Sequence, residues 1–158
     1  MPKYHSKNRL DDFEFHDSYV TINSFKGGVL DLSIEMLNIH SDAEQNTCGC
    51  DMEIEKTHIT FSGVTIDSVC PLSSVFTDTN GNKYILTTKF EGDTIETLKA
   101  QLLDRFKIYS LQVLPSDSKQ NISVDFDRID IIINIVLSFD SVEMEWDNFN
   151  GKAWYVRD

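Results

Sequence analysis

No apolar run in this 158-residue sequence reaches the roughly 18 residues that a membrane-spanning helix needs. The opening stretch, MPKYHSKNRLDDF, carries bases but lacks the apolar run of a secretory signal, so we expect no such signal. Cysteine is also scarce, and the three that occur are an odd number, which argues against a disulfide framework. These absences predict a cytoplasmic protein that spans no membrane.

The signatures of common cofactor, metal and catalytic sites are missing as well. The sequence has no Walker A, GxGxxG, EF-hand or HExxH pattern, and it has no G-x-S-x-G nucleophile elbow. We therefore predict no cofactor and assign no catalytic residue. An enzyme with an unrecognised site stays open as a third class of function.

Basic residues are few. The chain has 26 acidic and 14 basic residues and a formal net charge of −12. Three of the bases, Lys3, Lys7 and Arg9, lie in a short N-terminal segment without acids, which leaves 11 bases against 26 acids in the remainder. Such a body repels phosphate, which disfavours nucleic-acid binding, whereas an acidic face would suit a basic protein partner. Solubility alone would also account for the charge.

Composition and layout predict a single domain over residues 1–158. Hydrophobic residues make up 41% of the chain and aromatic residues 11%, as in ordinary folded domains. We see no fixed-period repeat and no linker long enough to divide the chain. Residues 1–10 are expected to form a mobile basic segment.

Alternation of apolar and polar residues is the dominant pattern, and it predicts β-strands. In VLDLSIEM, the apolar side of a half-buried strand comprises Leu30, Leu32, Ile34 and Met36. The preceding stretch, SYVTINSF, alternates in the same way. The glycine pair Gly27-Gly28 between them predicts a hairpin.

The length of this hairpin loop determines which residues lie opposite each other. A two-residue loop would place Ile22 opposite Ser33, whereas a three-residue loop, Lys26 to Gly28, places Ile22 opposite Leu32. Only the second register puts apolar residues together on one face. We therefore predict the three-residue loop, with Gly28 at positive φ.

A change of parity predicts a bend in the next strand. In DMEIEKTHITF, residues 51–61, the apolar positions move to the opposite face halfway along. A uniform strand cannot do this because its side chains alternate strictly. We predict a bulge or bend between Lys56 and His58.

Two Asn-Gly pairs predict two further hairpins. The first, at Asn80-Gly81, would pair residues across a two-residue loop as Asp78 with Lys83 and Phe76 with Ile85. The second, at Asn150-Gly151, would set an inward-facing Trp146 opposite Tyr155.

One segment, residues 92–107, predicts a helix. Asp93 stands three residues before Glu96, which resembles a capping box. An apolar stripe follows at Ile95, Leu98, Leu102 and Phe106.

The strand-rich remainder fixes the expected fold class. Residues 129–139 carry an unbroken apolar face, and Ile132 and Val136 add apolar residues to the other face, so we predict a central strand covered on both sides. Hairpin connections favour antiparallel pairing. We expect a mainly β (α+β) protein: a strongly bent antiparallel sheet, or a two-sheet sandwich or partial barrel, with one helix.

Residues 40–58, HSDAEQNTCGCDMEIEKTH, hold two of the three cysteines and two of the four histidines. By residue type, the candidate metal ligands are His40, Asp42, Cys48 and Cys50. The C-x-C spacing differs from the usual zinc knuckle. If residues 41–50 link antiparallel strands, His40 sits near Asp51 and His58 lies roughly 23 Å along the strand. We weigh a metal site and redox-sensitive thiols against a polar connecting loop, and expect the loop.

The triplet His16-Asp17-Ser18 suggests a catalytic relay at first sight. Adjacent residues on an extended chain point to opposite faces, so these three cannot form a relay with each other. We interpret the triplet as a turn or bend in which Asp17 or Ser18 satisfies backbone amides. Cys70, before Pro71, is expected to be a small buried hydrophobe.

The stretch from His16 to Ile34 combines His-Asp-Ser before a strand, a glycine turn and then L-x-L-x-I. This layout resembles the start of several small bacterial domains, some of them similar to immunity proteins of toxin systems, which are often small, acidic and cytoplasmic. The resemblance implies a toxin-neutralising binding role and supplies no functional residues.

Alternation also predicts an acidic strand face, comprising Glu143, Glu145 and Asp147, with Asp140 nearby. Such a row could bind cations or a protein, serve acid–base chemistry, or keep an exposed strand soluble.

We expect a non-enzymatic protein-interaction module with this acidic face, toxin-neutralising if the resemblance holds, and a basic protein as partner. The alternative is a small-molecule or metal-binding β-domain with the 40–50 loop at its site. A deep apolar pocket with convergent polar groups would favour the alternative.

Overall fold

The computed structural model describes residues 1–71, 74–86, 105–128 and 131–156. These residues form β-strands and one short 3-10 helix, η1. The elements, in chain order, are β1 (Tyr4–Lys7), η1 (Leu10–Asp12), β2 (Phe13–Glu14), β3 (Tyr19–Lys26), β4 (Val29–Glu35), β5 (Leu37–Ile39), β6 (Met52–Ile54), β7 (Thr57–Ser62), β8 (Thr65–Pro71), β9 (Ser74–Thr77), β10 (Lys83–Leu86), β11 (Phe106–Leu114), β12 (Gln120–Arg128), β13 (Ile131–Phe139), β14 (Ser141–Trp146) and β15 (Phe149–Lys152).

The strands form a nine-stranded sheet, a four-stranded sheet and a two-stranded ribbon, all paired antiparallel. The order in the large sheet is β1-β14-β7-β4-β3-β11-β12-β13-β8, and in the small sheet β15-β6-β5-β2. Over the described residues the large sheet does not close, because β1 and β8 remain its edges. The predicted mainly β, antiparallel and bent architecture is confirmed, without a closed barrel.

The one helix that we predicted is not found in the described part of the chain, where η1 is the only helical element. Residues 87–104, most of the predicted helix, lie outside the described residues. Its last apolar position, Phe106, belongs instead to β11 and is buried there. Nor is any described helix long and apolar enough to pass through a membrane.

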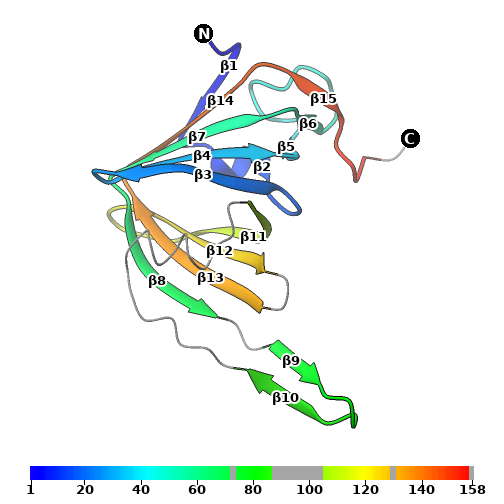
Figure 1. The fold of residues 1–158 in the computed structure, drawn as a ribbon. Helices are drawn as coiled ribbons and strands as arrows, with labels where there is room; N and C mark the ends of the chain where they lie inside the picture. Colours follow the sequence, from blue (N-terminus) through cyan, green and yellow to red (C-terminus); the bar gives the residue numbers. More distant parts are fainter. Residues whose placement is uncertain (72–73, 87–104, 129–130, 157–158) are drawn as a thin grey trace.

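Figure 1 shows the large sheet folded into two facing layers. The upper layer contains β1, β14, β7, β4 and β3, and the lower layer contains β11, β12, β13 and β8. Between the layers, the described ladder has only two residue pairs, Val20 with Phe106 and Tyr19 with Lys107. Apolar side chains from both layers fill the space between them. Over the described residues of both sheets, the largest fully buried side chains are Phe139, Ile34, Leu37, Ile39, Ile54, Ile59, Ile122, Ile133, Ile135, Met144, Val20 and Val142; Leu37, Ile39 and Ile54 belong to the small sheet.

The small sheet is a continuation of the upper layer across a kink. Its order, β15-β6-β5-β2, repeats the order of the strands that adjoin it in the chain, β14-β7-β4-β3. At the kink, each of these four strands of the upper layer is separated from its partner in the small sheet by a few residues outside strand conformation. These residues are 15–18 between β2 and β3, 36 between β4 and β5, 55–56 between β6 and β7, and 147–148 between β14 and β15. The change of parity from which we predicted a bend between Lys56 and His58 arises here, because the chain passes from β6 to β7 at residues 55–56. Met36, expected on the buried face, sits on the kink at φ 60° and is exposed.

The β3–β4 hairpin has the predicted pairing of Ile22 with Leu32, but its turn differs from the predicted one. The turn is the two-residue Gly27-Gly28, with φ of 59° and 74°, so the predicted three-residue loop is wrong although Gly28 has positive φ. Asn23 is left unpaired as a bulge in β3, which shifts the pairing by one residue. Ile22 therefore lies opposite Leu32, as the apolar face requires.

The β9–β10 hairpin forms where predicted, but its register differs by one residue. Thr77 pairs with Lys83, where we expected Asp78. The Asp78 carboxylate instead accepts hydrogen bonds from the N–H groups of Asn80 and Asn82, at 2.8 and 2.9 Å. This local capping makes the loop longer than two residues.

The predicted C-terminal hairpin is wrong. β14 pairs with β1 and β7, whereas β15 pairs with β6, because the kink at 147–148 carries the chain into the small sheet. Trp146 is buried as predicted, but it lies opposite Tyr4 and the two rings stack at 5.5 Å. Tyr155 follows β15 outside any strand.

Two further predictions concerned the burial of both faces of β13 and the mobility of residues 1–10. From Ile133 to Phe139 one face of β13 is buried as predicted, whereas Ile132 and Val136 on its other face are only half-buried. Its first predicted position, Ile129, lies outside the described residues. Within the N-terminal segment expected to be mobile, Tyr4–Lys7 form an edge strand along β14.

The chain crosses between the two layers twice at one corner, on the left of Figure 1. Gly63 and Val64 connect β7 to β8, and Asp140 connects β13 to β14. The Asp140 N–H donates to the Ser62 carbonyl at 2.8 Å, and the Val64 N–H donates to the Gly28 carbonyl at 2.9 Å. Gly63 has φ of 69°, and a Cβ there would lie 1.9 Å from the Asp140 carboxylate. A Cβ at position 63 would therefore fit only if the exposed Asp140 side chain rotated away.

We predict that Gly63→Ala lowers the free energy of unfolding more than Gly27→Ala does. Both positions have positive φ, which costs about 1–2 kcal/mol for alanine. Only Gly63 adds a clash, since nothing lies within 4 Å of a Cβ at Gly27, and relief of the clash would move the Asp140 carboxylate from its place beside Lys119. Urea unfolding of the two variants checks this. Equal losses would show that the corner tolerates a side chain.

Candidate functional site

The predicted acidic strand face lies beside the basic N-terminal strand; it comprises Glu143, Glu145 and Asp147. Lys7 Nζ lies 2.8 Å from a Glu143 carboxylate oxygen, and His5 lies across from Glu145. The Lys3 N–H donates to Asp147 at 2.9 Å. The hydrogen bond from Lys7 holds the pKa of Glu143 below its usual range. This face is therefore partly neutralised by the protein's own bases.

The 41–51 segment is an irregular loop between β5 and β6, as predicted. Sequence analysis missed the residue that organises it: the buried Asn46 amide donates to the carbonyls of Ile39, His40 and Cys50 and accepts from the Cys48 N–H. A single asparagine thus ties both ends of the loop together.

The four candidate metal ligands are not gathered. Over the described residues, no group of three or more His, Cys, Asp or Glu is placed to hold a metal ion. His40 contacts Asp51, Asp42 and Cys48 are exposed, and the Cys50 sulfur lies 3.8 Å from the Met52 sulfur. His58 lies in the other sheet, where it contacts Asp31. Cys70, expected to be buried, is exposed.

Asp51 is the hub of a polar network at the loop's end. His40 Nδ1 lies 3.1 Å from its carboxylate, the contact that strand geometry predicted, and the Tyr155 hydroxyl donates to it at 2.9 Å. The Ser41 N–H donates to the second carboxylate oxygen. Burial opposes ionisation of Asp51, but these hydrogen bonds together lower its pKa. Burial and the same carboxylate raise the pKa of Tyr155.

The triplet His16-Asp17-Ser18 forms the kink between β2 and β3, so the predicted turn is confirmed, but the side chain that accepts from the His16 backbone N–H is Glu14 and not Asp17 or Ser18. Asp17 has φ of 66°, and the Ser18 hydroxyl, fully buried, donates to the Met36 carbonyl across the kink. The Asp17 N–H donates to the Ile108 carbonyl, which anchors β11 here. No relay forms, because Ser18 is committed to the backbone.

Two exposed rings, of Tyr109 and Trp154, and the half-buried ring of Tyr155 gather around His16. We call this the aromatic surface, and it comprises His16, Tyr109, Trp154 and Tyr155. The His16 ring lies 5.6 Å from the Tyr109 ring and 6.4 Å from the Trp154 ring. Trp154 is 54% exposed and Tyr109 51%. Sequence analysis overlooked both, although Tyr109 falls on the outward parity of its strand, between buried Ile108 and half-buried Ser110.

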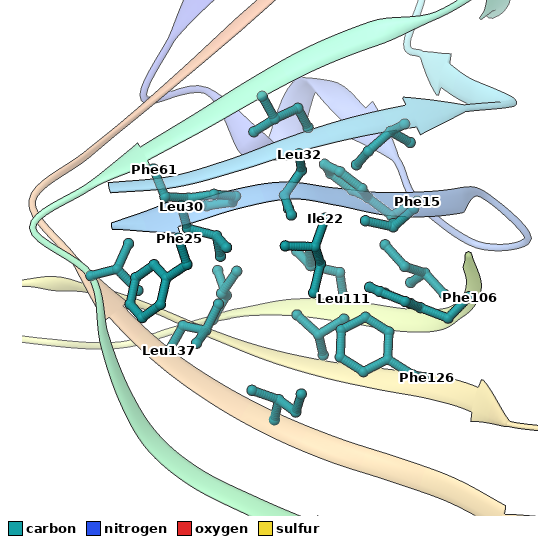
Figure 2. Close-up of a pocket in the computed structure, with 18 of the residues that line it drawn as sticks. Phe15, Ile22, Phe25, Leu30, Leu32, Phe61, Phe106, Leu111, Phe126 and Leu137 are labelled. Carbon is teal, nitrogen blue, oxygen red and sulfur yellow. The ribbon is translucent and has the colours of Figure 1, made fainter. Parts of the chain in front are cut away.

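Besides the aromatic surface, the structure has an apolar cavity between the two layers (Figure 2). The volume of this cavity is about 50 Å³. Every described residue around it is apolar, and both layers contribute, for example Leu30, Leu32 and Phe61 above and Leu111, Phe126 and Leu137 below. Nothing in residues 40–50 lines it.

We predict that Asp51→Asn makes unfolding less sensitive to acid. The pKa of Asp51 is lower in the folded than in the unfolded protein, so its contribution to stability is present above the unfolded value of about 3.9 and is lost as the pH falls through the folded value. Urea midpoints between pH 7 and pH 2 should therefore fall less steeply in the variant. Asp117→Asn, on the exposed loop after β11, is the control, and equal slopes for all three proteins would contradict the network's role.

We also predict that the purified protein carries no stoichiometric zinc and that the double change Cys48→Ser with Cys50→Ser leaves folding intact. A structural zinc would contribute directly to folding, so a chelator would unfold such a protein. Elemental analysis and circular dichroism in chelator check this. About one metal per chain, with loss of the folded signal in chelator, would overturn it.

Comparison with known proteins assigns no family to this chain. No family model matches the sequence, and neither a curated protein nor a solved structure matches it. Function must therefore follow from the geometry and chemistry of the chain's own residues.

Proposed function

We propose that this protein is a non-enzymatic protein-interaction module that binds a basic partner through the aromatic surface. The observation that carries the proposal is the pair of half-exposed rings, Trp154 and Tyr109, gathered around His16. Tryptophan and tyrosine are the side chains that most often dominate binding energy at protein interfaces. They supply a large apolar contact with little loss of conformational entropy.

The negative net charge of the chain favours a basic partner. With a net charge of −12, the protein attracts basic surfaces and slows the approach of acidic ones. Carboxylates also adjoin the rings: Glu14 accepts from the His16 N–H, and Asp51 accepts from Tyr155. An arginine or lysine of the partner could pack on the rings while it faces these carboxylates. A toxin-neutralising role is one form of this function and rests on the sequence resemblance alone.

The acidic strand face of β14 is a weaker candidate for the main contact. Its residues lie against the bases of β1, so a partner would compete with contacts already present. Exposed ion pairs of this kind contribute little by themselves. We therefore assign the face a supporting role in attracting a basic partner.

The competing class, a small-molecule or metal-binding β-domain with the 40–50 loop at its site, is favoured by one observation. The cavity between the layers is apolar, as a ligand pocket should be. Its described lining lacks the convergent polar groups that we would require of such a site, and the loop does not reach it.

We predict that Trp154→Ala and Tyr109→Ala each weaken binding of a basic protein by about 30-fold or more, the level expected of a hot spot. The first protein to test is the product of a gene adjacent to this one, if that product is basic. Isothermal titration calorimetry suits the measurement, because Trp154→Ala removes the exposed tryptophan that a fluorescence titration would follow and leaves only the buried Trp146. Both variants should keep the wild-type unfolding midpoint, since the changes remove only surface contacts.

Val113→Ala is the matched control, since Val113 is 45% exposed on β11 and lies outside the aromatic surface. It should change the affinity by less than about 3-fold, as expected of a residue outside a hot spot. Unaltered binding by Trp154→Ala and Tyr109→Ala, or equal binding of acidic and basic proteins by the wild type, would contradict the proposal.

A further inference from the structure

Three sulfur-containing side chains stand close together where the 41–51 loop enters β6. The sequence here is Cys48-Gly49-Cys50-Asp51-Met52, and both cysteines are free thiols. The Cys50 sulfur lies 3.8 Å from the Met52 sulfur. At a metal–sulfur distance of ~2.3 Å, a trigonal ion would hold its sulfur ligands ~4.0 Å apart. Cys50 and Met52 therefore already have the separation of two ligands of one ion.

The buried Asn46 amide fixes the backbone that carries the two cysteines. It accepts from the Cys48 N–H at 3.0 Å and donates to the Cys50 carbonyl at 2.9 Å. Gly49, between them, has φ of 75°, and nothing lies within 4 Å of a Cβ there, so the turn is open on that side. The two Cα atoms lie at most ~7 Å apart, since an extended chain spans at most ~3.6 Å per residue. The exposed Cys48 side chain can therefore turn its thiol to an ion bound by Cys50.

The oxygen and nitrogen donors beside the sulfurs are already engaged. The Asp51 carboxylate accepts from the Ser41 N–H and the Tyr155 hydroxyl, and it lies against the His40 ring. In the part of the chain that the structure describes, no three His, Cys, Asp or Glu residues are placed to hold a metal ion. A structural zinc ion takes four ligands of these kinds, a set that the loop does not supply. Thiolate and thioether ligands without nitrogen or oxygen donors instead select soft Cu⁺.

We propose that Cys48, Cys50 and Met52 form a binding site for one soft monovalent cation, Cu⁺. The two cysteines bind as thiolates, so each Cu⁺ releases two protons to solvent, and Met52 adds its neutral thioether. The hydrogen bonds of Asn46 hold the backbone of the site before the ion arrives, which reduces the ordering that binding requires. No residue of the aromatic surface is a ligand, so failure of this proposal would leave the proposed function unaffected.

Titration of the reduced protein with Cu⁺ in the absence of oxygen tests the site. The coloured complex of Cu⁺ with the chelator bicinchoninate reports the Cu⁺ that the protein has not bound. We expect the wild-type protein to withdraw about one Cu⁺ per chain from this complex, X-ray absorption to show sulfur ligands only, and excess Zn²⁺ not to displace the Cu⁺. Failure to withdraw Cu⁺, nitrogen or oxygen ligands, or displacement by Zn²⁺ would overturn the proposal.

Substitutions of the three ligands identify the site. Cys48→Ser and Cys50→Ser should each abolish withdrawal of Cu⁺ from the chelator, whereas Cys70→Ser, which removes an exposed cysteine elsewhere, should retain it. Met52→Leu should weaken Cu⁺ binding at least about tenfold, the smallest loss expected when even an outer-shell partner of a metal site is removed. Leucine replaces methionine at little cost to packing, so this variant should stay folded.

Met36→Leu is the matched control for Met52→Leu, because Met36 is exposed at the kink and lies outside the site. This control should bind Cu⁺ as the wild type does. Circular dichroism establishes that each variant is folded, and the folded variants decide the matter if one is not. Wild-type affinity in folded Cys48→Ser, Cys50→Ser or Met52→Leu, or equal losses in Met36→Leu and Met52→Leu, would overturn the proposal.

Discussion

The fold depends on the corner at which the chain passes between the two layers. Gly63 and Asp140 occupy this corner, and they are packed so closely that a side chain at position 63 would overlap the Asp140 carboxylate. Lys119 donates to the Gly63 carbonyl at 3.0 Å and lies 3.4 Å from the Asp140 carboxylate. Both connections between the layers, Gly63–Val64 and Asp140, lie next to each other, so the two layers are held together at this corner.

The apolar interior follows from that arrangement. The layers are joined covalently at one end, and over the described residues the β3–β11 ladder has only two residue pairs at the other. Two further backbone hydrogen bonds join Ile108 of β11 to Asp17 and Ser18 at the kink, and bulges occur at Asn23 in β3 and at Tyr109 in β11. A sheet folded in this way encloses apolar side chains from both halves without closing into a barrel.

The kink in the upper layer has a comparable effect on the surface. Four strands bend along one line, and at that line backbone with positive φ brings His16 out beside Tyr109 of β11. The C-terminal turn then adds Trp154, and Tyr155 ties this turn to the 41–51 loop through Asp51. The aromatic surface thus combines segments from both ends and the middle of the chain.

Charge is redistributed by the same topology. The bases at the N-terminus and the acids of β14 are far apart in the sequence, but β1 pairs with β14 and places Lys7 against Glu143. An acidic row that would otherwise face solvent unopposed is therefore partly compensated. The excess negative charge of the remaining chain stays available for attraction at a distance, which is an effect of net charge rather than of one face.

The sequence by itself determined the local pattern. Alternation indicated which residues of β4, β7 and β14 face inward, and this apolar face led to the pairing of Ile22 with Leu32, because burial of one face leaves a single acceptable register. It also indicated the bend near Lys56 and the contact of His40 with Asp51, since both follow from strand geometry alone.

Tertiary structure decided everything that depends on which strands become neighbours. A two-residue turn plus a bulge at Asn23 satisfies the same apolar face as a three-residue loop, and local sequence does not distinguish them. Likewise, an Asn-Gly pair permits a hairpin at 150–151, but pairing of Trp146 with Tyr4 of a distant strand prevails. The aromatic surface and the cavity are built from contacts between segments remote in the sequence, and alternation within one strand carries no information about such contacts.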